Sequence, residues 1–100
     1  MIFNNVILTA TNQADIEQIA SLLSEQAAMS EQEPGCVRFE VYQSQSEPDI
    51  FVLVEQWQSQ SHLDEHRQAP AFTDIYMPKV LPLVSRTAHP CTRIWPPESA

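Results

Sequence analysis

The segment from Val52 to Pro70, VLVEQWQSQSHLDEHRQAP, joins a buried strand directly to a short helix. Its first part is apolar at successive positions, which predicts a strand over Ile50–Trp57 with both faces covered. Ser59 or Ser61 can cap the helix that follows, and Pro70 ends or kinks it. The short connection therefore brings a Glu-x-Trp strand end next to a helix that carries two histidines.

The remaining patterns predict three more strands and a longer helix. Asn12 is a good N-cap, and apolar residues recur with helical spacing from Ile16 to Ala27. Glu33-Pro34-Gly35, with the only glycine of the chain, ends this helix. The other predicted elements are strands Ile2–Ala10 and Cys36–Tyr42, a helical turn or two over Phe72–Lys79, and a strand over Leu83–Trp95 that Pro90 splits into two pieces or confines to a sheet edge. This order is a split βαβ arrangement, an α+β fold whose antiparallel sheet has both helices on one face.

Length and charge restrict the class of protein. One hundred residues make one domain, which we place at 1–95, and the Pro-rich end at 96–100 is expected to be a disordered tail. A net charge of −8 repels phosphate backbones and anionic lipids, so neither nucleic acid nor membrane is an expected partner. No apolar run is long enough to span a bilayer and no signal core is present, so we expect a cytoplasmic protein with Cys36 and Cys91 reduced.

The second face of the predicted sheet indicates a partner. Ile50, Val52 and Val54 alternate with Phe51 and Leu53, so the central strand has apolar residues on both faces. In the strand over 36–42, Val37, Phe39 and Val41 are expected to share one face. Helices cover only one side of such a sheet, and a second copy of the chain is the simplest cover for the other. We therefore predict a homodimer with its sheets packed face to face.

Two stretches, EPGCVRFEVYQ and IFVLVEQWQSQSHLDEHRQAPAF, resemble the antibiotic biosynthesis monooxygenase domain and its quinol monooxygenase-like members. The shared pattern is a Pro-Gly turn into a strand, then Glu-x-Trp, then a helix with a histidine nine residues beyond the tryptophan, followed by a proline and an aromatic residue. The resemblance spans nearly the whole chain. It implies a ferredoxin-like monomer that pairs into a dimeric α/β barrel, with a pocket between sheet and helices. The family includes oxygenases that use no metal or flavin.

Trp57 and His66 are the candidate catalytic residues. Strand alternation places Trp57 on one face with Glu55, and helical spacing places His66 on the face turned toward the sheet. A histidine there can move protons near neutral pH, with Glu55 as a partner that tunes it. The alternatives are a core tryptophan bonded to a carbonyl and a buried structural histidine bonded to a carbonyl or to Glu55.

Polar and aromatic side chains on other elements complete the predicted substrate site. Asn4 or Asn5 faces the helices, and Asn4 does so if the pocket lies on the side of Val6 and Leu8. Phe72 and Tyr76, one turn apart, supply a ring and a hydroxyl that close the pocket or simply pack in the core.

Other site chemistries fit the sequence less well. His62 and His66 have the i, i+4 spacing of a metal pair, but no third ligand is evident, so no metal is expected. Relatives that oxidise polyketides carry an asparagine where this chain has Leu53. Relatives that degrade haem carry a tryptophan and an iron-ligating histidine where this chain has His66 and Tyr76, which disfavours haem as substrate.

The sequence thus predicts a monooxygenase without a cofactor that uses O₂ to oxidise a small phenol or quinol to a quinone. A ligand-binding dimer without turnover is the first alternative, because a pocket and a histidine serve both uses. The second is an isomerase of a small phosphorylated diketone, which needs a cationic anchor. Its candidate anchors are Arg38, Arg67, Lys79, Arg86 and Arg93.

Overall fold

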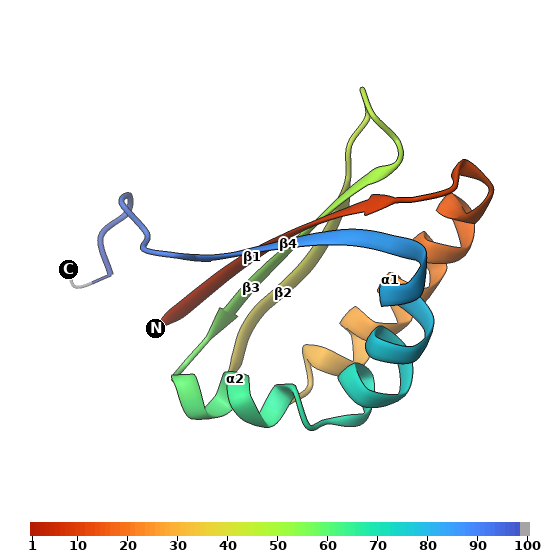
Figure 1. Ribbon diagram of the computed structural model, residues 1–100. Coiled ribbons are helices and arrows are strands. Elements are labelled where there is room, and N and C mark those ends of the chain that lie inside the picture. Colours follow the sequence, from red (N-terminus) through yellow and green to blue (C-terminus); the bar gives the residue numbers. More distant parts are fainter. Residues whose placement is uncertain (99–100) are drawn as a thin grey trace.

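The computed structural model describes residues 1–98, which form a four-stranded antiparallel sheet with helices on one side (Figure 1). The strands are β1 (Ile2–Ala10), β2 (Cys36–Gln43), β3 (Ile50–Trp57) and β4 (Val84–Cys91), in the sheet order β2-β3-β1-β4. Every neighbouring pair is antiparallel. The predicted α+β, ferredoxin-like arrangement is confirmed.

The helical segments begin where the capping residues place them. They are η1 (Gln13–Asp15), α1 (Ile16–Ser30), α2 (Gln60–His66), η2 (Ala71–Val80) and η3 (Leu81–Leu83). The Asn12 side chain accepts a hydrogen bond from the Ala14 amide at 2.9 Å. Ser59, of the two candidate serines, caps α2 by accepting from the His62 amide at 3.3 Å. These caps fix the points where the chain leaves the sheet.

The segment after α2 differs from the expected one or two helical turns. It is a ten-residue π-helix, η2, that begins immediately after Pro70 and contains Pro78. A proline inside a helix lacks the amide donor and clashes with the carbonyl four residues earlier, which disfavours α-helical bonding here. η2 packs along α1 and places Tyr76 in the core.

The last strand is a single edge strand, β4, rather than two pieces. It ends at Cys91 instead of reaching Trp95, and Pro90 lies opposite Asn4 near its end. Pro is tolerated on an edge strand, where no further strand needs its amide.

The apolar core lies between the sheet and the helices. Its larger cluster joins β1, β3, α1 and η2 through Val6, Leu8, Ile19, Leu23, Phe51, Leu53, Tyr76 and Val80. A smaller cluster under α2 contains Phe39, Trp57 and Leu63. Of the candidate site residues, Tyr76 and Trp57 belong to these clusters, and Phe72 packs against the larger one.

A β-bulge changes the predicted face of one residue in β2. Cys36 lies opposite Trp57 and Arg38 lies opposite Gln56, so Val37 is the extra residue between them. Val37 is therefore exposed, and the expectation that it shares a face with Phe39 and Val41 is wrong.

Within residues 1–98, all helices lie on one side of the sheet, and the other face is left open (Figure 1). On this open face Ile7 is 39 % exposed and Tyr42 is 52 % exposed, and Val52 and Val54 are partly buried. Residues beyond β4 run past the sheet edge, with Ile94 and Trp95 strongly exposed. Of the tail predicted at 96–100, positions 99 and 100 lie outside the described residues, and Glu98 lies 3.2 Å from the N-terminal amine.

No helix among residues 1–98 combines the length and apolar character needed to cross a membrane.

Candidate active site

β3 presents its buried face to the helices as its alternation predicts. Phe51, Leu53, Glu55 and Trp57 are all buried, while the residues between them are half-buried. Trp57 is 0 % exposed, and its Nε1 donates to Glu55 Oε1 at 3.1 Å. The partner of the indole is thus a side-chain carboxylate rather than a backbone carbonyl.

His66 lies on the inner face of α2, and its partner is Glu33 rather than Glu55. His66 Nδ1 and Glu33 Oε1 are 2.6 Å apart. An ionised carboxylate can only accept, so Nδ1 carries the hydrogen and the neutral ring has its lone pair on Nε2. No hydrogen bond among residues 1–98 involves Nε2. The turn after α1 therefore orients the histidine, and the expectation that Glu55 bonds to it is corrected.

The His66 ring sits inside an aromatic cluster drawn from both layers of the fold. Its centroid is 4.6 Å from the Trp57 ring at an interplanar angle of 34°. Phe39 lies 5.7 Å away and Phe72 lies 5.6 Å away. Phe72 also contacts Tyr76, with centroids 5.2 Å apart. These rings hold the imidazole in place and limit the access of water to it.

A small cavity, here called the inner cavity, borders His66 between the sheet and the helices. Its volume of about 10 Å³ corresponds to about one water molecule. Its lining comes from six elements of the fold and the turn after α2: Asn4, Gln26, Glu55, Leu63, His66, Arg67, Phe72, Tyr76 and Arg86. The structure thus brings together five of the predicted site residues, while Trp57 lies outside this lining and supports His66 from behind.

The two asparagines of β1 point to opposite faces. Asn4 is buried and lines the inner cavity, as the Val6 and Leu8 register implies. Asn5 lies on the open face, where its Nδ2 donates to Cys91 Sγ at 3.4 Å. It borders a separate hollow of about 280 Å³ on that face, so its inclusion in the predicted pocket is wrong.

Burial sets the electrostatics of the inner cavity. It raises the pKa of the Glu55 carboxyl, and the Trp57 hydrogen bond and the nearby His66 only partly offset this. Burial likewise raises the pKa of the Tyr76 hydroxyl, against the opposing effect of Arg86. Arg86 Nε donates to the Tyr76 hydroxyl oxygen at 2.9 Å. Tyr76 therefore stays protonated at neutral pH and can donate its own hydrogen.

Sequence reasoning missed two residues of the site, Glu33 and Gln26, and did not single out Arg86 among the candidate cations. Glu33 stood out only as part of a helix-ending turn, because nothing in the sequence shows which helix that turn will approach. Gln26 has no apolar character and so escaped the helical pattern. Arg86 was one of five candidate cations, and of these only Arg67 and Arg86 line the inner cavity.

His62 has a different environment from His66. Its Nδ1 lies 2.7 Å from Ser59 Oγ, and its ring packs against Gly35. Gly35 has φ of 78°, and a Cβ at this position would overlap the imidazole, so both conformation and space require glycine there. Within residues 1–98, no cluster of three or more His, Cys, Asp or Glu side chains is placed to hold a metal ion.

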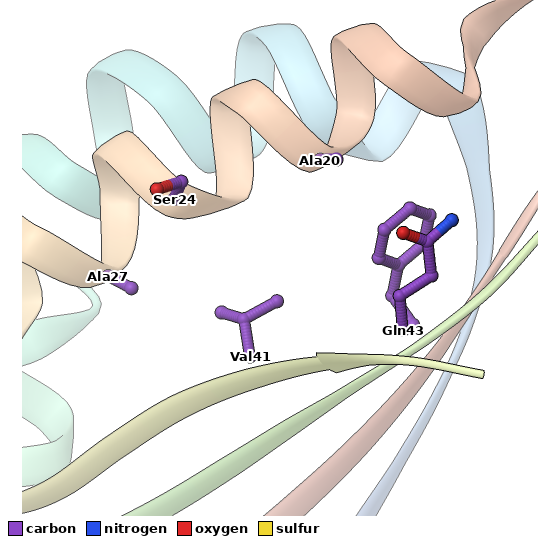
Figure 2. Close-up of a pocket in the computed structure, with 6 residues that line it drawn as sticks. Ala20, Ser24, Ala27, Val41 and Gln43 are labelled. Carbon is purple, nitrogen blue, oxygen red and sulfur yellow. The ribbon is translucent and has the colours of Figure 1, made fainter. Parts of the chain in front are cut away.

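A hollow much larger than the inner cavity lies away from this chemistry. Ala20, Ser24 and Ala27 of α1 face Val41 and Gln43 of β2 across a groove of about 350 Å³ (Figure 2). We call it the α1–β2 groove. The Gln43 amide is already paired, since its Nε2 donates to the Pro48 carbonyl at 2.7 Å. Despite its size, the groove contains no histidine, carboxylate or cation.

A family model described as antibiotic biosynthesis monooxygenase matches residues 1–76. The chain belongs to this family. Family membership supports a monooxygenase-type function.

Similar solved structures reproduce the whole fold. A Bacteroides thetaiotaomicron protein of unknown function, described as a possible oxidoreductase, has a TM-score of 0.84 at 24% identity and covers 90% of this chain and 94% of its own. A Nitrosomonas europaea protein assigned to the antibiotic biosynthesis monooxygenases has 0.84 at 18%, covering 96% and 93%. Protein SO0527 from Shewanella oneidensis has 0.79 at 25%, covering 90% and 88%.

One curated relative is similar over part of the chain. The uncharacterized protein sll1783 of Synechocystis is 37% identical over 43 residues, which is 43% of this chain. The match spans only 29% of that relative's length.

Proposed function

We propose that this protein is a cofactor-independent monooxygenase that uses O₂ to convert a small phenol or quinol to a quinone. The observation that carries the proposal is the Glu33–His66 pair, 2.6 Å apart, with the imidazole bordering the inner cavity. Glu33 fixes the tautomer that leaves Nε2 as a base. Membership of the antibiotic biosynthesis monooxygenase family supports the reaction class.

In the proposed reaction the substrate itself supplies the electrons. His66 Nε2 takes the hydroxyl proton, and the phenolate transfers an electron to O₂. Combination of the two radicals forms a C–O bond at a ring carbon that carries hydrogen, and the imidazolium returns its proton to give a hydroperoxide. The O–O bond then breaks as that carbon loses its hydrogen, giving a C=O group and one water. One oxygen atom enters the ring and the other leaves as water.

The other residues of the site orient the substrate and exclude water. The Asn4 amide lies across the inner cavity on β1 and can fix a substrate oxygen. Phe72 and Tyr76 supply aromatic walls, and Trp57 with Glu55 holds the His66 ring from behind. A dry, shaped site favours electron transfer from a phenolate to O₂ over side reactions.

Substrate entry requires the inner cavity to widen. Ligand sites commonly have about 300–1,000 Å³, whereas this cavity has about 10 Å³. Phe72 is the one half-buried ring among the aromatic residues that surround His66, and it lies at the start of η2. We propose that displacement of the Phe72 ring opens the site and that the aromatic substrate takes its place beside His66.

We also propose that the working molecule is a homodimer, with its open sheet faces packed together. The exposed Ile7 and the partly buried Val52 and Val54 supply an apolar surface on that face. Ile7→Glu places a charge in the centre of this surface, so we expect a shift from dimer to monomer. Sedimentation equilibrium of wild type and Ile7→Glu at matched concentrations measures this, and a monomeric wild type contradicts the proposal.

Oxygen consumption by chelator-treated protein tests the function directly. A panel of phenols and quinols is assayed against autoxidation, with wild type, His66→Ala and Trp57→Phe. His62→Gln is the matched control, because His62 lies on the same helix but outside the inner cavity. We expect uptake that requires His66 and survives His62→Gln. Equal uptake by wild type, His66→Ala and Trp57→Phe would show that these roles are wrong.

The rival is a ligand-binding dimer without turnover, because a pocket and a histidine serve both uses. A protein that only holds a ligand needs no route for O₂ and no product release. If aromatic ligands raise the thermal unfolding midpoint in a His66-dependent way while oxygen uptake stays at the autoxidation rate, the binding function replaces the monooxygenase.

A further inference from the structure

The buried stripe of α1 becomes polar where it approaches the inner cavity. Its four buried residues are Ile19, Leu23, Gln26 and Ser30, spaced by one helical turn each. Gln26 is 1 % exposed and Ser30 is 0 % exposed, and neither Gln26 Oε1 nor Ser30 Oγ has a hydrogen-bond partner. Native proteins rarely leave such buried acceptors unpaired, so these atoms call for an explanation.

Gln26 lines the inner cavity, so its unpaired acceptor can be satisfied from there. Two of the neighbouring groups already have partners, since His66 Nδ1 bonds to Glu33 and Arg86 Nε bonds to Tyr76, and neither the Asn4 amide nor the Tyr76 hydroxyl is bonded to Gln26 Oε1. In the closed cavity one water molecule has room to donate to Gln26. When the cavity opens, the donor that replaces this water must come from the ligand, and a hydroxyl group suits the acceptor.

Arg86 adds a second recognition group to the same cavity. Its guanidinium is held by the Tyr76 hydroxyl and lies 5.9 Å from the centre of that ring. Arg38 pairs with Glu40 and Arg67 with Asp64, whereas Arg86 makes no ion pair within residues 1–98. Arg86 is exposed on the edge strand and also borders the inner cavity, so its guanidinium can bind an anionic group of a ligand that enters there.

We propose that Gln26 and Arg86 select the substrate, and that it is a quinol carrying a carboxylate. One hydroxyl faces His66 Nε2, the second donates to Gln26 Oε1, and the carboxylate binds Arg86. The assignment of turnover rests on the proposed function above, but the binding preference does not.

Anaerobic titration calorimetry separates binding from oxidation. The probes are 2,5-dihydroxybenzoate, hydroquinone, which lacks the carboxylate, and benzoate, which lacks the hydroxyls. We expect the dihydroxybenzoate to bind wild type about tenfold or more tightly than either of the others, as for one charge-assisted or buried hydrogen bond. Equal affinities for all three overturn the proposal.

Two variants assign each part of the preference to its residue. Gln26→Met keeps the side-chain length without the acceptor, so it should weaken dihydroxybenzoate and hydroquinone about tenfold and leave benzoate unchanged. Arg86→Gln should weaken dihydroxybenzoate and benzoate about tenfold and leave hydroquinone unchanged. Gln18→Met, an exposed glutamine on the same helix, is the matched control. A Gln26→Met protein that binds all three probes like wild type overturns the role of Gln26.

Failure of this inference differs from failure of the proposed function. Selective binding without oxygen uptake removes the monooxygenase and leaves the recognition of a carboxylated quinol intact. Oxygen uptake with hydroquinone that is no weaker than with 2,5-dihydroxybenzoate leaves the monooxygenase intact and overturns the selection by Arg86.

Discussion

The α1–β2 groove is much larger than the inner cavity, but the inner cavity contains the reactive side chains. The groove has about 350 Å³, and the inner cavity has about 10 Å³. The groove is lined by small and apolar side chains and by Gln43. The side-chain amide of Gln43 is already hydrogen-bonded to the Pro48 carbonyl. The inner cavity gathers His66, Glu55 and Arg86 from three elements, together with the unpaired acceptor of Gln26.

The difference shows that volume and reactivity are separate properties of a site. A groove between a helix and an edge strand arises wherever small residues such as Ala20 and Ala27 leave space. Burying an imidazole, a carboxyl and an unpaired amide together destabilises the fold unless the groups are hydrogen-bonded. Such a cluster is therefore more typical of a functional site than of packing. We therefore assign the chemistry to the inner cavity. The groove is a space left by imperfect packing between α1 and β2.

The largest expected change in kcat/KM comes from a substitution in the inner cavity, and the comparison is a substitution in the groove. His66→Ala should lower kcat/KM for a reactive quinol by about 10²–10⁴-fold, the usual contribution of a general base. Ser24→Leu, which fills the α1–β2 groove, should leave kcat/KM within about twofold of wild type. Oxygen electrode assays on both variants measure this. A loss of turnover in Ser24→Leu with none in His66→Ala would exchange the roles of the two regions.

Cys36 reports the electrostatics of the region next to the site. Burial, with Glu33 and then Glu55 adding to it, raises the pKa of the Cys36 thiol from 9.0 to about 11. Its thiolate fraction near neutral pH is then about a hundredfold below that of an ordinary thiol. In a Cys91→Ser background, the alkylation rate of Cys36 should keep rising up to about pH 11.

A thiol placed in the groove provides the comparison for Cys36. Ser24→Cys, in a chain that also carries Cys36→Ser and Cys91→Ser, should level off near the ordinary value of 9.0, because Ser24 is exposed. Identical pH profiles for the two thiols would show that burial and the two carboxylates do not act on Cys36.

Glu33→Gln tests whether the carboxylate does more than fill space. Gln keeps the shape, but its amide can donate to Nδ1 and so permits the tautomer that takes the lone pair away from Nε2. We expect kcat to fall on the order of tenfold with little change in KM, as for other residues that orient a catalytic group. Glu65→Gln on the exposed side of α2 is the control. An unchanged kcat shows that Glu33 does not orient His66.

Substitution of Glu55 is expected to have the smallest effect, a change in how the free energy of unfolding depends on pH. Its raised pKa means that the folded protein keeps this proton to higher pH than the unfolded chain does. The free energy of unfolding of wild type therefore falls as pH rises above 4.5, until the folded carboxyl has also ionised. Glu55→Gln retains an acceptor for Trp57 and has no such loss.

Urea unfolding of wild type and Glu55→Gln at pH 4 and pH 8 measures this difference. The two proteins should be similar at pH 4, and Glu55→Gln should be the more stable at pH 8. Relative to Glu55→Gln, the variant Glu55→Leu leaves the Trp57 N–H without a partner, so its free energy of unfolding should be lower by about 1–3 kcal/mol at both pH values. A greater advantage of Glu55→Gln at pH 4 than at pH 8 would contradict the raised pKa.

Local sequence patterns determined most of the fold. Caps at Asn12 and Ser59, alternation in β3 and the turn at Gly35 act over a few residues, and all are visible in the sequence. The same local rules placed Glu55 and His66 on the buried side of their elements but left open whether Asn4 or Asn5 faces the helices. They failed at the β2 bulge and at η2, where Val37 and Pro78 alter a regular repeat.

Only the tertiary structure decided which of these buried groups meet. Glu33 and His66 are 33 positions apart, and Gln26 reaches the inner cavity from α1 because that helix packs along η2. Such pairings depend on how helices cross the sheet, which no short-range periodicity encodes. The sequence by itself therefore determined the elements, their faces and the histidine, whereas packing between distant elements decided the partner of that histidine, the unpaired amide beside it and the size of the cavity they share.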